Sequence, residues 1–391
     1  EVSYRTSRLP IAGLGFAAFR DTAAWLKHAP EAPVHPQYAI AFGSSQSGRF
    51  LRTFLYYGFN TDEQGAQVFD GVIAHIAGAA RLSLNERGAN PNGLAMWTAT
   101  AFPFANAAMR DPISGRTEGL LDNDRARQHQ PKIFYTNTAV EYWGGGRSAA
   151  LIHTTPDGSR DIPIPENTRI YFLTGTQHGP ARFPARVANG QQPDNPAEYA
   201  WTMRALLVAM ENWVSKNAPP PASQYPQLAN HTLVPADDLH FPAIPGVKPP
   251  GMSFAAQQDG HPLPYLVPAV DDDGNEIAGI RTAEIAVPVA TYTGWNFRNA
   301  HVGSPAQLYP LLGSAIPFPL TRADRETAHD PRRPLEERYP ARERYLEAAR
   351  KVNQQLVKGG YLLPEDVPQV MKRVEAHWIE RRTLKTSAVQ R

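Results

Sequence analysis

Four short apolar runs, separated by helical or irregular stretches, most constrain how this 391-residue chain can fold. Runs of this length without polar alternation are typical of strands that are buried on both faces of a parallel sheet. Helical patterns lie between or beside them. The alternation predicts an α/β fold, a mostly parallel sheet flanked by helices. The runs occupy residues 38–42, 68–77, 132–136 and 169–173, and the helical patterns 11–28, 50–56 and 196–216.

The chain changes character near residue 219. The sequence holds 37 prolines, crowded into its second half, and Pro219-Pro220-Pro221 fits neither a helix nor a central strand. We predict a core over 1–218, with an irregular aromatic excursion at about 80–130. A proline-rich C-terminal region over 219–391 is expected to pack on this core.

Within the C-terminal region, we expect extended segments first and helix later. The acidic turn at 271–276 is expected to join two strands, the second of them over 277–285. The turn lacks the ligand spacing of a calcium loop, so we predict no metal there. Residues 341–385 carry a helical pattern.

The first apolar run leads directly into Gly43-Ser-Ser-Gln-Ser-Gly48 and then into a helix. A nucleophilic serine in such a strand–turn–helix sits on a strained backbone, so the residues two before and two after it must be small. Centring on Ser45 meets this condition, whereas centring on Ser44 or Ser47 places Phe42 or Arg49 at one of these positions. We predict Ser45 as the nucleophile.

The alternative is a Gly/Ser-rich turn in which Ser45 is an ordinary helix N-cap. If the turn is catalytic, the backbone amide of Gln46 lies at the N-terminus of the next helix. There it is expected to donate to a developing oxyanion, helped by the helix dipole.

A serine hydroxyl needs a base to take its proton, and His178 is the candidate among twelve histidines. It lies on the loop after the last predicted strand and before the helix at 196–216, where such a sheet presents its base. His75 lies inside an apolar run and is expected to be a buried, hydrogen-bonded core residue. His129 and His153 lie in less regular stretches.

The acid is expected between serine and histidine in the sequence. Glu141 is the first carboxylate after the strand at 132–136, and its role would be to orient the imidazole and stabilise the imidazolium. An exposed loop glutamate is the alternative reading of Glu141. Glu86 competes for the role, and Asp157 does so less strongly because it lies in a Pro-Asp-Gly turn.

Three segments together resemble one group, the bacterial "alpha/beta hydrolase domain" proteins of the α/β-hydrolase superfamily. They are Gly43–Arg52, Thr138–Trp143 and Gly175–Gly179, and the resemblance continues through 271–276 and 291–296. It implies a hydrolase fold with a Ser45–His178–Glu141 triad. It implies little about the substrate.

The chain departs from a complete hydrolase core at one point. Such a core places about four strands before the strand–turn–helix that carries the nucleophile (the nucleophile elbow). Here only 44 residues precede Ser45. The loop that normally supplies the second oxyanion amide has no candidate. We therefore expect an N-terminal segment or a separate chain to complete the sheet, whose edge would otherwise be open.

The leading functional hypothesis is hydrolysis of a small-molecule carboxylic ester through an acyl-enzyme on Ser45. An amidase, a peptidase or an acyltransferase with the same triad is the second, and a non-catalytic scaffold or binding protein that retains the fold is the third. Tyr142, Trp143 and Trp97 are candidates to line a substrate pocket, or else they pack the excursion. Arg49 would bind a substrate carboxylate or form a structural ion pair.

The remaining features narrow the class further. A net charge of +2 without a basic block gives no reason to expect nucleic acid as a partner. The chain has no cysteine and no apolar stretch that could span a membrane. It has no phosphate loop or clustered metal ligands, so no cofactor and no metal are expected. The sequence does not determine the cellular compartment, and a secreted or periplasmic location is favoured over the cytoplasm.

Overall fold

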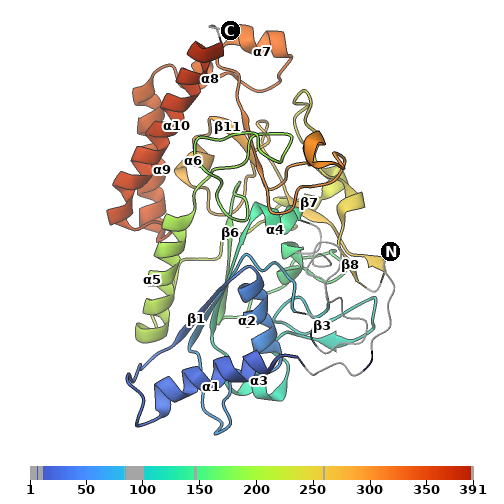
Figure 1. Cartoon of the computed structure of the whole chain (residues 1–391), viewed down its shortest axis with the longest axis vertical. Helices are drawn as coiled ribbons and strands as arrows, with labels where there is room; N and C mark the ends of the chain where they lie inside the picture. Colours follow the sequence, from blue (N-terminus) through green and yellow to red (C-terminus); the bar gives the residue numbers. More distant parts are fainter. Residues whose placement is uncertain are drawn as a thin grey trace.

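The computed structural model describes residues 12–82, 101–144, 148–258 and 260–388, together with Ser7 and Leu84. These residues contain a parallel sheet of four strands in the order β1-β2-β5-β6 (Figure 1). The predicted α/β fold with a parallel sheet is confirmed. The strands are β1 Ile40–Ser44, β2 Gly71–His75, β5 Lys132–Thr138 and β6 Thr168–Leu173.

The register of the sheet brings the carboxyl ends of its strands to one edge. Ser44 of β1 pairs with His75 of β2, and His75 pairs with Thr136 of β5. Thr138, the last residue of β5, pairs with Leu173, the last residue of β6. The loops that follow β1, β5 and β6 therefore leave the sheet close together.

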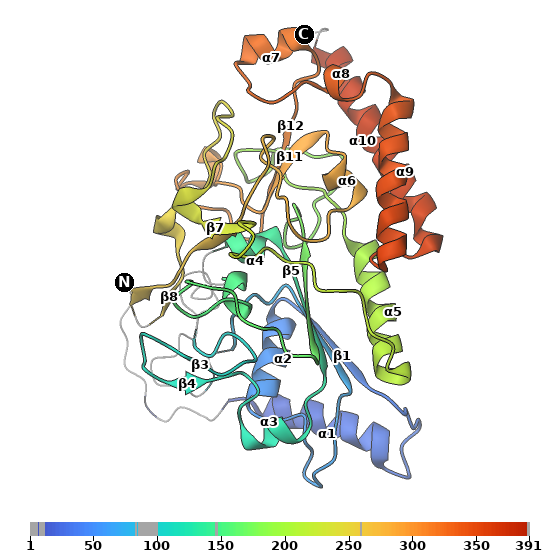
Figure 2. The same ribbon diagram turned by 180° about the vertical axis from the view of Figure 1, so that it is seen from behind.

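Helices cover both faces of the sheet because side chains alternate along each strand. Val72 and Ala74 of β2 belong to the same buried cluster as Phe54 of α2. The intervening Ile73 belongs to another cluster, with Leu206 of α5. Figure 2 shows the two helices from behind, on either side of the strands. The helices around the sheet are α1 Leu14–His28, α2 Gln46–Tyr56 and α5 Ala200–Lys216.

The excursion between β2 and β5 packs onto the core through aromatic side chains. Phe102 and Phe104 are both buried in the cluster that contains α2. Trp97, named above as a candidate pocket residue, lies outside the described residues. The described elements of the excursion are β3 Met109–Arg110, β4 Thr117–Glu118 and α3 Asp124–Gln128.

Arg52 of α2 ties this excursion to the sheet. Its guanidinium is fully buried and donates hydrogen bonds to the carbonyls of Ala79, Ala80 and Phe104. It also lies 4.9 Å from the ring centroid of Tyr135 on β5. A single side chain thus satisfies three backbone acceptors that the irregular chain leaves inside the protein.

The C-terminal region extends the sheet beyond β6. Gln224 forms a parallel bridge with Tyr171, and Ile280 forms one with Leu173. The N–H of Phe172 donates to Gln224 at 2.7 Å, and the N–H of Ile280 donates to Phe172 at 2.7 Å. The outer edge of β6 is therefore covered. Within the described part of the chain, β1 pairs on one side only.

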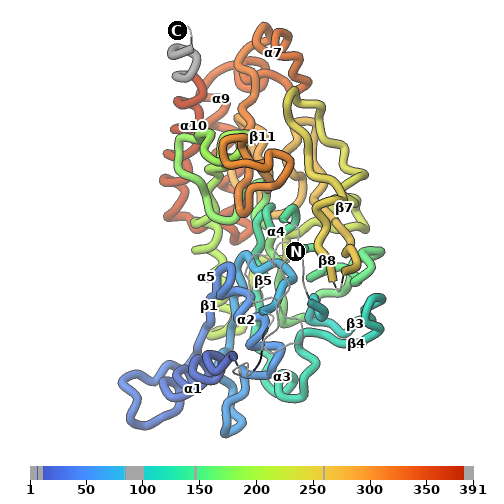
Figure 3. The backbone as a smooth tube through the Cα atoms, turned by 45° about the vertical axis from the view of Figure 1, so that its right-hand side comes forward, coloured from blue at the N-terminus to red at the C-terminus, as the bar shows by residue number. Residues whose placement is uncertain are grey.

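Figure 3 shows the proline-rich region, in yellow to orange, lying over the end of the sheet where helix α4, Ala139–Trp143, begins. Its elements are short, as the proline content predicts. They form three antiparallel pairs, β7 with β10, β8 with β9, and β11 with β12. The strands are β7 Leu233–Pro235, β8 Gln257–Gln258, β9 His261–Pro262, β10 Leu266–Pro268, β11 Ala290–Thr293 and β12 Ser314–Pro317.

The strand expected over 277–285 is wrong. Only Ile280 bridges the sheet, and α6, Ala283–Ala286, begins three residues later. Gly279 is the physical reason: its φ is +88°, and a Cβ there would lie 2.5 Å from Phe172. Such a backbone angle turns the chain instead of extending it.

The helical pattern expected over 341–385 is confirmed and forms two helices. Helix α9, Arg342–Gly359, ends where Gly360 adopts a left-handed conformation with φ 79°. Pro364 then opens a short turn before α10, Val367–Ala388. The smaller helices that precede this pair are α7 Arg322–Ala328 and α8 Leu335–Arg338.

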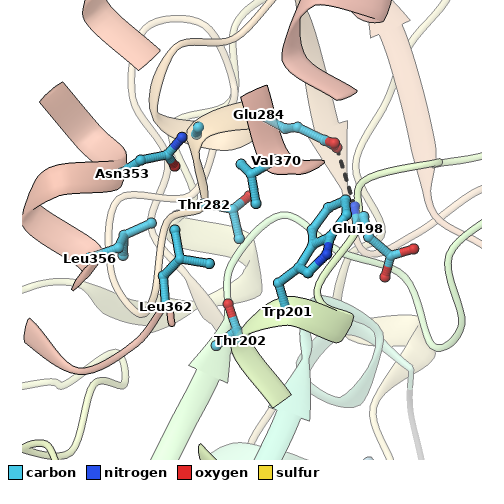
Figure 4. A pocket seen from close by; sticks show the side chains of 10 residues that line it. Glu198, Trp201, Thr202, Thr282, Glu284, Asn353, Leu356, Leu362 and Val370 are labelled. Carbon is cyan, nitrogen blue, oxygen red and sulfur yellow. Dashed lines mark hydrogen bonds between the residues drawn. The ribbon is translucent and has the colours of Figure 1, made fainter. Parts of the chain in front are cut away.

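The buried carboxylate Glu284 of α6 links the C-terminal helices to the core. It accepts hydrogen bonds from Arg373 of α10 at 3.0 Å and from the backbone amide of Glu198 at 3.2 Å. Figure 4, a close view of the pocket that Glu284 and Glu198 line, shows the second of these bonds. Burial raises the pKa of Glu284 to about 7.

No helix among the described residues is long and apolar enough to cross a membrane.

We predict that Arg52→Met destabilises the protein by about 2–4 kcal/mol, because three buried carbonyls lose their donor. Chemical denaturation measures this loss. The matched control is Arg127→Met on α3, where the guanidinium is 59% exposed in its ion pair with Asp122. An Arg52→Met variant as stable as the Arg127→Met control would contradict the structural role of Arg52.

Candidate active site

Ser45 occupies a strained turn between β1 and α2. Its φ of 58° and ψ of −114° lie in a region that residues with a side chain rarely adopt. Two backbone hydrogen bonds hold it there: its N–H donates to the carbonyl of His75 at 2.9 Å, and its carbonyl accepts from Arg49 at 3.0 Å. The side chain therefore projects from the carboxyl edge of the sheet, as the strand–turn–helix pattern predicts.

Two glycines make this turn sterically possible. A Cβ on Gly43 would lie 2.4 Å from the carbonyl oxygen of Ser47, and one on Gly48 would lie 2.7 Å from that of His75. The sequence argument required small residues two positions either side of Ser45. Gly48, three positions after Ser45, meets an equally strict condition because β2 passes directly beside it.

A chain of hydrogen bonds joins the three residues that the sequence singles out. His178 Nε2 lies 2.8 Å from Ser45 Oγ, and His178 Nδ1 lies 2.7 Å from Glu141 Oε1. Glu141 is fully buried and His178 is 9% exposed. With its Nδ1–H donating to the carboxylate, the imidazole presents Nε2 as an acceptor toward the serine hydroxyl.

Glu141 is held in place by the end of the strand that precedes it. It lies on α4, Ala139–Trp143, which follows β5 directly. Glu141 Oε2 accepts from the backbone N–H of Thr138 at 2.9 Å and from the Thr138 hydroxyl at 2.5 Å. The bond from the Thr138 N–H is one half of a capping box, whose other half is the Thr138 side chain accepting from the backbone N–H of Glu141. One oxygen of the carboxylate is thus engaged by Thr138, while the other faces His178.

The loop that carries His178 is anchored at His178 itself and at the residue before it. The Tyr199 hydroxyl donates to the backbone carbonyl of His178 at 2.6 Å. The neighbouring Gln177 accepts from the N–H of Gly313 at 2.9 Å and from that of Asn195 at 3.2 Å. On the other side of His178, a Cβ on Gly179 would meet nothing within 4 Å.

Two further predicted residues lie on the first turn of α2. Gln46 is its first residue and is exposed, and the first amide groups of a helix have no acceptor within the helix. Its N–H is thus available beside Ser45. Arg49 is 3% exposed and lies within the core side of the helix.

His75 occupies the end of β2, next to the site. It is 5% exposed and its Nδ1 lies 2.8 Å from the Thr136 hydroxyl, as expected of a core histidine. Burial lowers the pKa of His75 to about 4, so the ring is neutral at pH 7. It therefore adds no charge beside the Glu141–His178 pair.

Asp157, one of the two competing acids, does not contact His178. Asp157 forms a local turn in which its carboxylate accepts from the N–H of Ser159 at 3.1 Å and from the Thr155 hydroxyl at 2.5 Å. Glu86 lies outside the described residues.

The described residues contain no cluster of three or more His, Asp or Glu that would hold a metal ion.

The two aromatic residues after Glu141 differ in what they do. Tyr142 is 1% exposed, and its hydroxyl lies 3.0 Å from His153 Nε2, so it packs the core. Trp143 lines a groove of about 370 Å³. Val140 lies on the same wall, so the groove touches α4 on both sides of Glu141. Its other aromatic and aliphatic walls include Phe254, Trp295, Leu308, Tyr309 and Leu312.

Sequence reasoning missed the residues that support the predicted triad. Thr138 carried a readable signal, because Thr138-x-x-Glu141 matches the capping-box pattern. Tyr199 and Gln177 carried none, since their contacts depend on how distant loops meet. Glu276 was noticed only as part of an acidic turn, yet its carboxylate reaches the backbone of Gly175 at 2.7 Å.

A family profile described as "Alpha/beta hydrolase domain" matches residues 2–372, nearly the whole chain. The chain therefore belongs to the α/β-hydrolase domain family, as its resemblance indicated. This membership supports hydrolase activity in general. No curated protein and no solved structure shows a significant match to the chain.

We predict that Gly48→Ala destabilises the protein by about 1–3 kcal/mol, because the new methyl group must displace the backbone of β2. Thermal or chemical unfolding measures the change. The matched control is Gly15→Ala in α1, where a Cβ meets nothing within 4 Å. That substitution should be neutral or stabilising by roughly 0.5–1 kcal/mol. Equal effects at both glycines would contradict the packing argument.

Proposed function

We propose that this protein is a serine hydrolase that cleaves carboxylic esters of small molecules through an acyl-enzyme on Ser45. One observation carries the proposal: the continuous hydrogen-bond chain from Ser45 Oγ through His178 to the buried carboxylate of Glu141. The strained backbone at Ser45 supports it, because strain of this kind concentrates at functional sites.

The chemistry follows from the role of each atom. His178 Nε2 takes the hydroxyl proton as Ser45 Oγ attacks the ester carbonyl carbon, and a tetrahedral oxyanion forms. Collapse of this intermediate breaks the bond to the alcohol, which leaves with the proton from His178. Water then attacks the acyl-enzyme while His178 accepts its proton. The bond from the acyl carbon to Ser45 Oγ breaks, His178 returns the proton to Oγ, and the carboxylic acid leaves. Glu141 stabilises the imidazolium in both halves of the cycle.

The oxyanion is assigned to the N-terminus of α2. The amide of Gln46 is the first of a helix that begins directly after the nucleophile, so both its N–H and the helix dipole favour negative charge there.

Amide hydrolysis and acyl transfer would use the same three residues. Ester cleavage is preferred because an alkoxide leaving group needs less help from the acid than an amine does. Retention of all three residues argues against a silent scaffold.

We also propose that the groove beside α4 receives the apolar part of the substrate. Val140 and Trp143 on one wall flank Glu141 in the sequence, and Leu312 on another precedes Gly313, which bonds to the neighbour of His178. A volume of about 370 Å³ suits a ring or a short alkyl chain. The favoured substrates are therefore esters with a bulky apolar acyl group.

The proposal includes a further strand on the edge of β1 that no described residue pairs with, supplied by an N-terminal segment or by a separate chain. Phe42 on this strand is 56% exposed, and Tyr38 just before it is 39% exposed. An unpaired, apolar strand edge favours strand addition. Added strands would also bring a loop beside Ser45, from which a second oxyanion donor could come.

We expect a fluorophosphonate to add once to the wild-type protein and not to Ser45→Ala, as measured by intact mass. His178→Ala should slow both labelling and ester turnover by about 10³-fold or more, and Glu141→Gln by about 10²-fold or more. Asp157→Asn and Glu86→Gln serve as controls for the competing acids and should leave the rates unchanged.

An adduct on the Ser45→Ala variant, or full activity in both His178→Ala and Glu141→Gln, would refute this triad. If the 391-residue chain forms no adduct until the segment that pairs with β1 is added, the unpaired edge of β1 explains the lack of labelling. If no adduct forms even then, the hydrolase proposal is wrong.

Leu308→Trp should fill part of the groove. We expect it to raise the KM for a bulky aryl-acyl ester about 10-fold or more, while turnover of the acetyl ester of the same alcohol is unchanged. Leu207→Trp on α5 is the control, because Leu207 is 49% exposed on a different helix. Equal losses for both esters would place the acyl group elsewhere.

A further inference from the structure

We propose that Glu276 is a positioning residue for the triad, acting as a bridge that holds the acid helix α4 and the histidine loop in mutual register. The inference rests on the proposed function and extends it to a residue outside the hydrogen-bond chain. It begins from an unusual placement: Glu276 is 1% exposed, although it ends an acidic turn in the C-terminal region.

The two carboxylate oxygens of Glu276 bind two different segments. Oε1 accepts from the indole N–H of Trp143 at 2.9 Å, and Oε2 accepts from the backbone N–H of Gly175 at 2.7 Å. Trp143 is the last residue of α4 and lies two positions after Glu141. Gly175 lies three positions before His178. One side chain therefore joins the short segments that carry the acid and the base.

The bridge is itself rigidly supported. Asp271 Oδ1 accepts from the amides of Asp273 at 3.0 Å and Asn275 at 2.9 Å, which closes the turn before Glu276. Asn275 in turn exchanges hydrogen bonds with β11, through the N–H of Tyr292 at 2.8 Å and the carbonyl of Ala290 at 3.2 Å. The turn that precedes the Glu276 carboxylate is thus held by hydrogen bonds within the C-terminal region.

Gly175 is well suited to be the point of attachment. Its φ is +65°, and a Cβ there would lie 2.9 Å from Ile285, so a residue with a side chain would be strained and crowded at this position. Its carbonyl accepts from Asn195 at 2.8 Å. Both backbone polar groups of Gly175 are therefore hydrogen-bonded, which fixes the start of the segment that leads to His178.

Burying a carboxylate is costly, and here the cost is visible. Burial raises the pKa of Glu276 to about 7, even though the bonds from Trp143 and Gly175 and the charge of Arg281 favour the ionised form. The other titratable group that faces it is Tyr142, whose pKa is raised by burial. Arg281 also lies 3.7 Å from Asp271. An apolar side chain would fill this position at lower cost, so the bridge itself explains why an acid is there.

Ionisation decides how well the bridge works. The carboxylate anion accepts both N–H groups, whereas the protonated acid must turn an O–H toward one of these donors or find another acceptor. As the pH falls through about 7, Glu276 gains its proton and the bridge weakens. As the pH rises above 7, the bridge is complete. The part of the rate that depends on Glu276 should therefore follow its ionisation.

The test compares Glu276→Gln with the wild-type protein, by ester turnover and by the rate of fluorophosphonate labelling from pH 5 to pH 9. A displacement of about 1 Å at a catalytic group costs roughly 10²-fold in rate, so we expect kcat to fall about 10- to 100-fold above pH 8. KM should change little. The wild-type to variant ratio should shrink below pH 7, where the wild-type bridge is itself lost.

The matched control is Glu284→Gln. Glu284 is equally buried, and its pKa is also raised to about 7, but it bonds with Arg373 and with the amide of Glu198 (Figure 4). We expect a loss of stability from this substitution with kcat and its pH profile unchanged. If Glu276→Gln does not fold, Trp143→Phe removes one donor and keeps the carboxylate. It should then show a smaller loss of kcat in the same direction.

A second readout does not depend on turnover. The His178 Nδ1 proton in its bond to Glu141 should give a far-downfield proton NMR resonance in the wild-type protein. We expect this resonance to shift or broaden in Glu276→Gln and to stay in place in Glu284→Gln.

The outcomes separate the two proposals. If the wild type labels at Ser45 while Glu276→Gln matches it at every pH and keeps the downfield resonance, the positioning role is refuted and the hydrolase remains. A pH-independent ratio of wild type to variant would reduce Glu276 to a purely structural role and refute the bridge as proposed. If the wild type forms no adduct at Ser45 even when the segment that pairs with β1 is added, the hydrolase proposal fails, and the NMR resonance alone then decides whether Glu276 orders the pair.

Discussion

The site depends on the hydrogen-bonded register of the parallel sheet. Because Ser44 is level with His75, and Thr138 is level with Leu173, the chain leaves β1, β5 and β6 at the same edge. Short connections then suffice to bring a serine, a carboxylate and an imidazole together. No side chain needs to reach far, which is why Ser45 Oγ and Glu141 Oε1 both lie within 2.8 Å of the His178 ring nitrogens.

Local geometry turns this proximity into a directed contact. At Ser45 the backbone is strained, and the strain is held by a hydrogen bond to β2 and by two glycines that admit no side chain. At Glu141 the constraint is of another kind, since Thr138 takes one carboxylate oxygen and leaves the other for His178. The serine is thus fixed by its backbone, and the acid by its own helix cap.

Sequence reasoning reached the parts of this arrangement that depend on short-range pattern. The sheet, the elbow and the order of Ser45, Glu141 and His178 all follow from apolar runs and from the residues that come directly after them. It failed where distant segments decide the outcome. The segment over 277–285 is apolar enough for a strand, but Gly279 turns it against Phe172. The contact of Tyr199 with His178 likewise arises only when α5 packs beside the loop.

The proline-rich C-terminal region is part of the frame of the site, not an appendage to it. Gln224 and Ile280 cover the edge of β6, Gly313 holds Gln177, and Glu276 reaches both α4 and the loop before His178. Proline suits this task, because extended segments with fixed φ lose little entropy when they are laid across a folded core. Strand β1, which leads to the strained serine, lies at the opposite end of the strand order from β6. The two edge strands of the sheet therefore differ. One is closed by this region, while β1 in the described structure is paired on one side alone.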